Sequence, residues 1–425
     1  MITLLIIIAF ITGYIAIAFE HPLKLNKAAS ALITGVVCWT IYILNSDTPH
    51  MVSDELVHHL GDIASILFFL LGAMTIVELI DSHNGFDIIT QKIKTTSKAK
   101  LLLLIIIITF FLSALLDNLT TAIVMTSLCK KILSEKEDRL WFAGMIVIAA
   151  NAGGAWSPLG DVTTTMLWIG GQITALNIMK QLIIPSLVAC IIPAFIVIQR
   201  FRGKKIVSMP QLENSIKEKR DGNIILLSGI GFLVFVPFFK TLTHLPPFMG
   251  IMLAVGLMWV ITTIIHKGKD DEIAEKYTVA KALQKVDSPS ILFFLGILLA
   301  VSALQSFGVL KELATFLSSS LKDHYLIGIV LGLLSAIVDN VPLVAASQGM
   351  FDLSTYPTDH PFWEFLALTT GTGGSTVIIG TAAGVAVMGI EQINFMWYLK
   401  KIGWLALIGF VAGILIFLLQ IQLFG

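Results

Sequence analysis

Two Asp-Asn pairs stand inside long apolar stretches of this chain. Asp117-Asn118 lies within SALLDNLTTAIVMT, and Asp339-Asn340 lies within SAIVDNVPLVAAS. An ionised carboxylate surrounded by lipid costs several kcal/mol, which makes an acid in such a stretch a candidate for binding a cation or a proton. Asp and Asn are also good helix N-caps, but capping alone needs no charge. The repetition of the pair predicts that the two aspartates are halves of one site.

Two other segments combine oxygen-bearing side chains with glycines that interrupt a helix. Residues 151–161 read NAGGAWSPLGD and residues 370–381 read TGTGGSTVIIGT, with Asp161 aligned to Thr381. Irregular backbone at membrane depth is tolerated only where it faces protein or a water-filled cavity, although paired glycines also serve close helix packing. Carboxylate, amide and hydroxyl oxygens suit a hard cation such as sodium. The candidate cation- and proton-binding residues are therefore Asp117, Asn118, Thr121, Asn151, Ser157, Asp161, Thr164, Asp339, Asn340, Thr372, Ser375 and Thr376.

Other residues that could carry chemistry have simpler explanations. Glu78 has two open interpretations, as an interfacial acid or as a member of a proton path. Glu364 is interpreted as interfacial, and each of the nine histidines as a surface residue, although histidine could sense pH. The three cysteines have no paired spacing, so neither a disulfide nor a metal cluster is predicted. The chain carries neither HExxH nor a paired His-Cys motif, so neither an enzyme nor a bound cofactor is predicted.

The composition indicates what surrounds these residues. Hydrophobic residues make up 56% of the 425 and charged residues only 13%, whereas a soluble domain carries about 25% charge. Apolar runs such as 1–19, 28–44 and 402–423 are long enough to cross ~30 Å of hydrocarbon as helices. An all-α polytopic membrane protein is therefore predicted. The formal net charge is zero, so no nucleic-acid partner is implied.

The apolar run 101–133 must position the first Asp-Asn pair. Lys98 and Lys100 precede this run, and four basic residues follow it up to Arg139. Since basic residues favour the cytoplasmic side, both ends are predicted to be cytoplasmic, and the run forms a re-entrant hairpin. A second hairpin is predicted over about 325–350. The ten predicted spans are 1–19, 28–45, 61–80, 179–199, 223–239, 247–266, 289–306 and 402–423, with broken spans over 141–169 and 363–388.

The second half of the chain repeats the first. SILFFL occurs at residues 65–70 and again at residues 290–295, and Gly153-Gly154 maps onto Gly373-Gly374 in the same order along the chain. With the N-terminus outside, 24 of the 28 Lys and Arg residues fall in cytoplasmic loops. The two repeats are then inverted, as in secondary transporters whose site lies at the repeat interface. The predicted parts are a repeat over 1–199, a basic cytoplasmic linker over 200–222 and a repeat over 223–425.

The chain resembles the NhaD-type sodium/proton antiporters of the ion transporter superfamily. The resemblance covers nearly the whole chain and is most specific at SALLDN, SAIVDN and NAGGAWSPLGD. It implies a dimeric antiporter of the bacterial inner membrane that exports sodium or lithium in exchange for protons, with no cofactor. Carried over position by position, the implied site is Asp117, Asn118, Asn151, Asp161, Asp339 and Asn340, with Glu78 in addition. The sodium ligands would be Asp117, Asn118, Asp161, Asp339 and Asn340.

Two transport functions are compatible with these residues. In antiport, a monovalent cation and a proton compete for the same carboxylates, which load on one side of the bilayer and release on the other. The alternative is sodium-coupled uptake of an organic anion, as in the dicarboxylate carriers of the same superfamily. The resemblance gives those carriers neutral Ser-Asn-Thr hairpin tips, and acids at both tips depart from that pattern. No Lys or Arg occurs within a span core to bind a dianion, which favours antiport.

Overall fold

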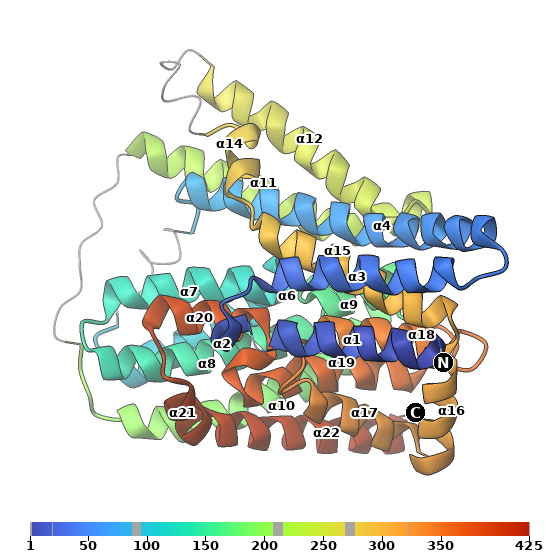
Figure 1. The fold of residues 1–425 in the computed structure, drawn as a ribbon. Coiled ribbons are helices and arrows are strands. Elements are labelled where there is room, and N and C mark those ends of the chain that lie inside the picture. Colours follow the sequence, from blue (N-terminus) through green and yellow to red (C-terminus); the bar gives the residue numbers. More distant parts are fainter. Residues whose placement is uncertain are drawn as a thin grey trace.

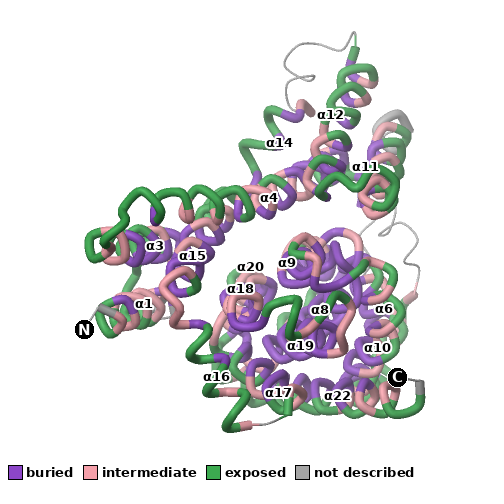
Figure 2. The backbone as a smooth tube through the Cα atoms, turned by 90° about the vertical axis from the view of Figure 1, so that its right-hand side faces the viewer, coloured by how far each residue is buried: buried purple, intermediate pink, exposed green. Residues whose placement is uncertain are grey.

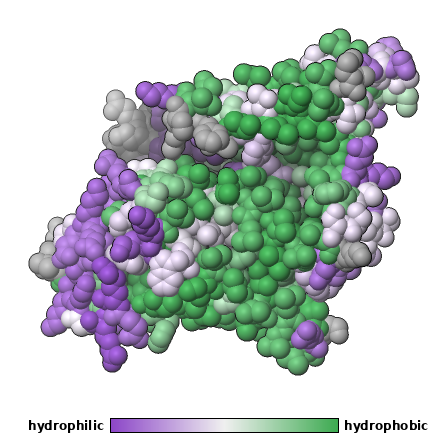
Figure 3. Space-filling model, turned by 60° about the horizontal axis from the view of Figure 1, so that its bottom comes forward, coloured by the Kyte–Doolittle hydropathy of each residue, from purple (hydrophilic) through white to green (hydrophobic). Residues whose placement is uncertain are grey.

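The computed structural model describes residues 2–18, 20–86, 95–206, 216–267, 277–321 and 323–424. Within these ranges the chain is helical, apart from connecting segments and one isolated β-bridge between Ser97 and Lys205. Eight of the described helices are long and apolar enough to cross a membrane, namely Lys27–Leu44, Pro49–Ser82, Lys98–Leu116, Ala175–Phe201, Arg220–Thr243, Pro247–His266, Ser288–Ser306 and Phe395–Leu423. A broad hydrophobic band covers the face seen in Figure 3. The chain is therefore a multi-pass, all-helical membrane protein.

The helices form two groups; in Figure 2 the upper group also extends down the left side, and the lower group fills the centre and the lower right. We call the upper group the flanking layer; it contains α1 (Ile2–Ala18), α3 (Lys27–Leu44), α4 (Pro49–Ser82), α11 (Ile216–Thr243), α12 (Pro247–His266), α14 (Val279–Lys285) and α15 (Ser288–Ser306). We call the lower group the core bundle; it contains α6 (Lys98–Leu116), α7 (Asn118–Ile132), α8 (Lys136–Ala155), α9 (Val162–Ile169), α10 (Ala175–Phe201), α17 (His324–Leu334), α18 (Asn340–Met350), α19 (Pro361–Gly373), α20 (Ala382–Glu391) and α22 (Trp404–Phe424).

Five short helical elements complete the described chain. They are α2 (Glu20–Leu23), α21 (Phe395–Tyr398), the 3-10 turns η1 (Gly374–Thr376) and η2 (Ile378–Gly380), and the π-helical turn η3 (Leu399–Gly403). A longer helix, α16 (Val309–Leu321), follows α15 and lies across the end of the molecule that carries both chain termini (Figure 1).

α8 and α19 lie at the centre of the core bundle. Residues 141–155 of α8 and 362–373 of α19 are all buried, as the purple tube of Figure 2 shows. A helix that is apolar on all sides is expected where protein surrounds it completely. Both helices contain glycines that allow other backbones to approach closely. A Cβ on Gly153 would lie 2.2 Å from the carbonyl oxygen of Phe110, and one on Gly373 would lie 2.1 Å from that of Gly332.

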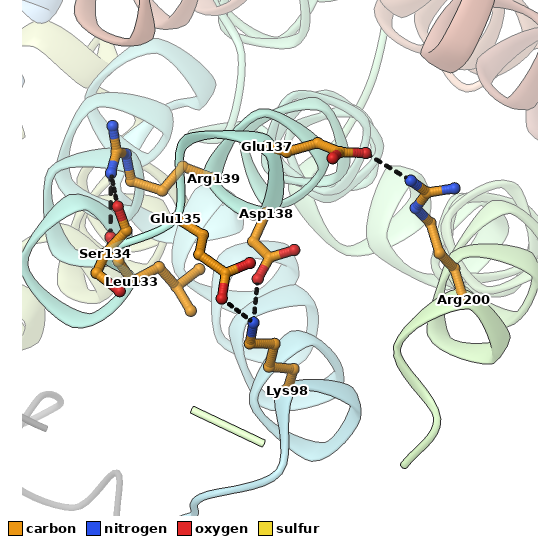
Figure 4. A network of polar contacts seen from close by, with 8 residues as sticks. All are labelled: Lys98, Leu133, Ser134, Glu135, Glu137, Asp138, Arg139 and Arg200. Atoms are coloured by element: carbon orange, nitrogen blue, oxygen red, sulfur yellow. Dashed lines mark hydrogen bonds and ion pairs between the residues drawn. The ribbon is translucent and has the colours of Figure 1, made fainter. Parts of the chain in front are cut away.

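The predicted run 101–133 is divided into two helices that meet at Asp117. This residue separates α6 from α7 and has a φ of 78°, in the left-handed region that non-glycine residues seldom adopt. At the other end of the pair, the Lys98 ammonium lies 3.1 Å from Glu135 and 2.5 Å from Asp138 (Figure 4). The start of α6 and the end of α7 are therefore neighbours, and the two helices form a hairpin.

α17 and α18 form a second hairpin. The ring centroids of His324, at the start of α17, and Phe351, just after α18, lie 6.1 and 5.4 Å from that of Tyr356. The two helices span His324–Leu334 and Asn340–Met350, and the re-entrant hairpin over about 325–350 stays a prediction. At its tip, residues 335–339 connect the helices, and Asp339 caps α18 by accepting a 3.2 Å bond from the backbone N–H of Val341.

The two predicted broken spans are interrupted, though later along the chain than the glycines suggested. The glycines of residues 151–155 continue α8, and the irregular backbone covers residues 156–161 before α9 begins. In the second half, η1 and η2 separate α19 from α20. In each half of the chain, a serine of the hairpin donates a hydrogen bond to a carbonyl of the broken span. Ser113 Oγ donates to the Ala150 carbonyl at 2.6 Å, and Ser335 Oγ donates to the Thr370 carbonyl at 2.7 Å.

Two features of the fold differ from the sequence prediction. Residues 49–60, predicted to lie in a loop before span 61–80, form the first turns of α4, which begins with Pro49 at its first position. Hydropathy marks only the apolar part of a helix, whereas a polar segment with a proline at its start continues the same helix outside the lipid. No helix was predicted over residues 309–321, which form α16. This helix is too short and too polar for its hydropathy to indicate a membrane span.

Ion pairs secure one end of the core bundle. Besides the Lys98 cluster, Arg200 near the end of α10 lies 2.7 Å from Glu137 at the start of α8 (Figure 4). Arg139 donates to the carbonyls of Leu133 and Ser134 after α7 at 3.2 and 2.9 Å, and its Nε lies 3.0 Å from Glu391 at the end of α20. These contacts hold the starts and ends of five core helices together.

Candidate functional site

The tips of the two hairpins meet at the carboxylate of Asp161. Asn118 donates from Nδ2 to Asp161 Oδ2 at 2.8 Å, and Asn340 donates from Nδ2 to both carboxylate oxygens at 3.2 and 3.4 Å. Asp161 is the N-cap of α9 and accepts the backbone N–H of Thr163 at 3.1 Å. Each of these asparagines is the first residue of its helix. One carboxylate thus joins both hairpins and the break between α8 and α9.

Asn151 extends this cluster across the bundle. Its Oδ1 accepts from Asn118 at 3.1 Å, while its Nδ2 donates to Ser375 Oγ at 2.9 Å and to Thr381 Oγ1 at 3.1 Å. Asn118, Asn151, Asp161 and Asn340 are each 5% exposed or less. Both broken spans and both hairpins therefore contribute to one buried polar cluster, which contains five of the candidates predicted from the sequence.

Thr381 is a member of the cluster that the candidate set left out. It is the N-cap of α20 and accepts the backbone N–H of Gly384 at 3.2 Å, the same role that Asp161 plays for α9. The sequence signal was its alignment with Asp161 in the second half. The candidate set included hydroxyl residues from the glycine-rich part of this segment and did not extend to its end at Thr381.

Asp117 and Asp161 line one small cavity of about 20 Å³. This is room for a single particle of the size of a water molecule or a bare monovalent cation. The rest of its lining is apolar apart from Thr165, and comes from α4, α11 and the ends of α6 and α9. Asp117 Oδ1 and Oδ2 accept the N–H and hydroxyl of Thr120 at 2.8 and 2.9 Å. Two carboxylates in an apolar wall make this a candidate cation site.

Asp339 does not line that cavity. It lies in the wall of a separate cavity of about 470 Å³, together with Thr381 and residues of α1, α3 and α15. The prediction that the two hairpin aspartates are halves of one site therefore differs from the geometry, because the asparagines beside them are what meet. At each tip the aspartate caps the helix and the next residue, the asparagine, points to Asp161.

Four predicted hydroxyl residues bind backbone or have no partner in the described chain. Ser157 Oγ donates to the Ala114 carbonyl at 2.5 Å, Thr164 Oγ1 to the Asp161 carbonyl at 2.9 Å, and Thr372 Oγ1 to the Leu368 carbonyl at 2.5 Å. Thr121 Oγ1 is buried, and the described residues offer it no hydrogen-bond partner.

Ser157 and Thr164 shape the break around Asp161, whereas Thr372 lies within α19. Thr376, partly buried at the end of η1, follows Ser375 of the cluster. Within the described ranges there is no group of three or more His, Cys, Asp or Glu side chains that could hold a resident metal ion.

Comparison with known proteins is consistent with a transport role. A family model described as a citrate transporter, CitMHS, matches residues 7–371. The chain belongs to this family. Sodium/proton antiporter 2 of Arabidopsis thaliana is 44% identical over 410 residues, which are 96% of this chain and 97% of that protein. Sodium/proton antiporter 1 of the same plant is 45% identical over 96% of this chain and 70% of its own length.

Bacterial relatives of this transporter family are also similar to the chain. The Na(+)/H(+) antiporter NhaD of Vibrio cholerae is 29% identical over an alignment of 447 positions, which covers 97% of this chain and 91% of that protein. The resemblance to NhaD-type antiporters inferred from the hairpin and break motifs is thereby confirmed. The family and these relatives are transporters, as expected of a chain without enzyme motifs.

Several ionisable residues of this transporter lie outside the central cluster. Glu78, on α4, forms a 2.9 Å ion pair with Lys285 of α14 and therefore belongs to the flanking layer. Glu364 was interpreted as interfacial, but it is 1% exposed and accepts a 2.6 Å bond from Asn177 Nδ2. It is therefore not a surface residue, because the start of α19 packs against α10.

Two histidines also differ from the prediction of surface residues. His83 and His266 are 5% and 7% exposed, and their Nε2 atoms lie 2.9 Å apart. Each lies at the end of a long helix of the flanking layer, α4 or α12. A loop or span end in sequence is therefore not necessarily a surface position, since the ends of neighbouring helices cover one another.

Proposed function

We propose that this protein exchanges sodium or lithium for protons across a bacterial inner membrane by alternating access, and that it works as a homodimer. The observation that carries the proposal is the cavity between Asp117 and Asp161, whose volume suits one small cation. The relatives from Arabidopsis and Vibrio are named sodium/proton antiporters, which supports sodium and protons as the transported ions.

In this mechanism the cation and the proton compete for the same carboxylates. A sodium ion bound between Asp117 and Asp161 neutralises charge that protons neutralise in its absence. The amides of Asn118 and Asn340 hold the Asp161 carboxylate in place. Exchange follows when cation loading and proton release take place on opposite sides of the bilayer.

The proposal includes two inverted repeats, over residues 1–199 and 223–425, joined by a cytoplasmic linker over 200–222. Corresponding contacts in the two halves support it. Ser113 binds the carbonyl of Ala150 as Ser335 binds that of Thr370, and Gly153 and Gly373 each approach the backbone of the neighbouring hairpin. In an inverted pair, the two hairpins are re-entrant and bring their tips to the middle of the membrane from opposite sides.

The proposed topology places the N-terminus outside. Of the basic residues, 24 of 28 then lie in cytoplasmic loops. The chain N-terminus and the ion-paired start of α8 lie toward opposite ends of the molecule in Figure 1. This arrangement is consistent with a basic cytoplasmic end formed by Lys98, Arg139 and Arg200.

The description of the family as citrate transporters favours a second candidate, sodium-coupled uptake of an organic anion. Such an anion needs fixed cations or free helix N-termini. The Asp117–Asp161 cavity has neither a Lys nor an Arg in its described lining, and Asp117, Asp161 and Asp339 cap the helix N-termini that point toward the cluster. A dianion would meet uncompensated carboxylates there, so we place antiport first.

Transport in everted membrane vesicles separates the two candidates. Vesicles with a respiration-driven pH gradient, reported by a fluorescent dye, receive sodium, lithium or potassium chloride at several pH values. Antiport predicts that sodium or lithium dissipates the gradient and potassium does not. Labelled citrate that accumulates under an imposed sodium gradient, with no cation-dependent proton movement at any pH, would overturn the proposal.

A further inference from the structure

Asp339 lines a cavity that is separate from the Asp117–Asp161 cavity. It has a volume of about 470 Å³ and lies between the flanking layer and the core bundle, with Tyr14 and Ile17 of α1 on one side and Thr381 and Val385 near α20 on the other. Ile337, in the same wall two residues before Asp339, is 63% exposed, so the cavity is open. Glu20 and Lys27, at the connection between α1 and α3, also line the cavity. In the proposed topology this connection is cytoplasmic.

The described wall of this cavity contains one basic residue. Lys27 is the first residue of α3, whose N-cap Asn26 accepts the N–H of Ala28 at 2.8 Å. Its ammonium lies 4.6 Å from the centroid of the Phe293 ring, which also lines the cavity. A cation over an aromatic face is held by electrostatic attraction that is weaker than a carboxylate contact. Lys27 is thus partly buried and lines the same cavity as Asp339.

The charges around Asp339 make Lys27 significant. Asp339 shares the wall of this cavity with Tyr14 and Lys27. Glu20, in the same wall, accepts the backbone N–H of Lys27 at 3.3 Å. α15 and α20 contribute no charged group to the described wall. Lys27 is therefore the one basic residue in the described wall of the cavity that Asp339 lines.

We propose that Lys27 is the resident counter-ion of Asp339 and competes with the transported cation and the proton for this carboxylate. The inference rests on the proposed antiport and deepens it, because it assigns a residue that sets cation and proton affinity on the cavity side. When a monovalent cation or a proton reaches Asp339, the ammonium withdraws to the Phe293 ring. When the cation or the proton departs, the Lys27 ammonium replaces it and neutralises the Asp339 carboxylate.

Removal of the ammonium changes both affinities in the same direction. Without Lys27, the potential at Asp339 is more negative, so sodium and protons both bind more tightly. Lys27→Gln should lower the half-saturating sodium concentration about tenfold at alkaline pH, where protons do not compete, and should move the pH range of exchange upward by about one unit. Lys27→Arg retains the charge and should restore wild-type values.

The test combines sodium binding with transport. Sodium-dependent thermal stabilisation of the purified full-length protein reports binding without turnover, and everted vesicles report the pH profile. Lys24→Gln is the matched control, since Lys24 is exposed and lies outside the cavity. In the Asp339→Asn background, Lys27→Gln should leave sodium binding unchanged, because the carboxylate for which it competes is gone. Lys27→Met serves as a second neutral variant if Lys27→Gln is recovered in low yield.

The possible outcomes separate this inference from the proposed function. Wild-type protein that moves no protons in response to sodium or lithium contradicts antiport itself. Wild-type exchange that stays the same in Lys27→Gln and Lys27→Met, in both half-saturation and pH range, overturns only the role of Lys27. The role of Lys27 is also overturned if the effect of Lys27→Gln persists in the Asp339→Asn background, or if Lys24→Gln reproduces it.

Discussion

The side-chain amide of Asn118 donates a 2.8 Å hydrogen bond to the carboxylate of Asp161. Asn118 begins the second arm of one hairpin, and Asp161 ends the break in a different span. Asn340 of the second hairpin donates to the same carboxylate at 3.2 Å. A displacement of either hairpin tip therefore changes the environment of one acid, which is the type of coupling that an alternating-access exchanger requires.

Asp161→Asn is expected to abolish cation-dependent proton movement while the protein still inserts and folds. The substitution preserves the size of the side chain and removes its charge and its titration. An amide oxygen in the place of Oδ2 still accepts from Asn118 and Asn340, so the contact between the hairpin tips is kept, while the cap of the Thr163 N–H at Oδ1 is lost. Vesicle assays at matched expression levels measure the effect. Wild-type exchange in this variant would show that Asp161 neither binds the cation nor carries the proton.

Asn118→Ala is expected to weaken sodium binding. The change removes an amide that positions the Asp161 carboxylate, and a hydrogen bond to a charged group contributes about 1.5–3 kcal/mol, equivalent to roughly ten- to hundredfold in half-saturating sodium. Asn223→Ala, at an exposed position of α11, is the matched control and should leave binding unaltered. Equal sodium affinity in the two variants would be inconsistent with the proposed role of Asn118.

The half-saturating sodium concentration is expected to rise as pH falls. At low pH the carboxylates hold protons, and a proton must leave before sodium binds. For one competing proton the rise approaches about tenfold per pH unit below the pKa of the site. Initial rates of dye dequenching, measured over a grid of sodium concentration and pH, give this slope. A sodium affinity that stays constant over three pH units would mean that the two cargoes use separate sites.

Gly153→Ala is expected to destabilise the core bundle. A Cβ at this position would lie 2.2 Å from the Phe110 carbonyl, which is backbone and cannot rotate away. Overpacking of this type costs about 1–3 kcal/mol or more, visible as a lower melting temperature in detergent. Gly231→Ala is the control, because no atom lies within 4 Å of its Cβ. Equal melting temperatures would contradict the close approach of α6 and α8.

Lys98→Met is expected to destabilise the protein more than Lys100→Met does. Lys98 is 6% exposed and pairs with Asp138, which is also 6% exposed, whereas Lys100 is exposed. Loss of one partner leaves the other charge buried, at a cost of about 3–5 kcal/mol. Thermal unfolding of the purified variants measures the difference. Similar stabilities would indicate that water reaches Asp138 freely and that the pair does not hold the first hairpin.

The sequence was sufficient to locate the interrupted helices. Asp117 and Asp339 stand out because charge is rare in apolar runs, and the hairpin over 101–133 follows from the lysines at both of its ends. Sequence reasoning could not determine which residue of each pair faces the centre. Consecutive residues at a helix start point in different directions, and the rotation of α7 and α18 depends on contacts with Asp161, 43 and 179 residues away along the chain.

Burial of polar residues was the less predictable part. His83 and His266 pair at the ends of two helices that hydropathy treats as independent spans, and Glu364 is covered by α10 through Asn177. These contacts join residues far apart in sequence and leave no local pattern. Thr381 is an exception, since its alignment with Asp161 was visible in the sequence, and the internal duplication pointed to the position even though the residue is neutral.

The most direct test compares sodium-driven proton movement in proteoliposomes of the purified wild-type protein with that of Asp117→Asn and Asp161→Asn. Asn has the size and branching of Asp, so Asp117→Asn changes charge more than shape. The account predicts that an inward sodium gradient drives proton efflux in the wild type and that neither variant exceeds protein-free liposomes. Undiminished sodium-driven proton efflux in both variants would contradict the assignment of the Asp117–Asp161 cavity as the exchange site.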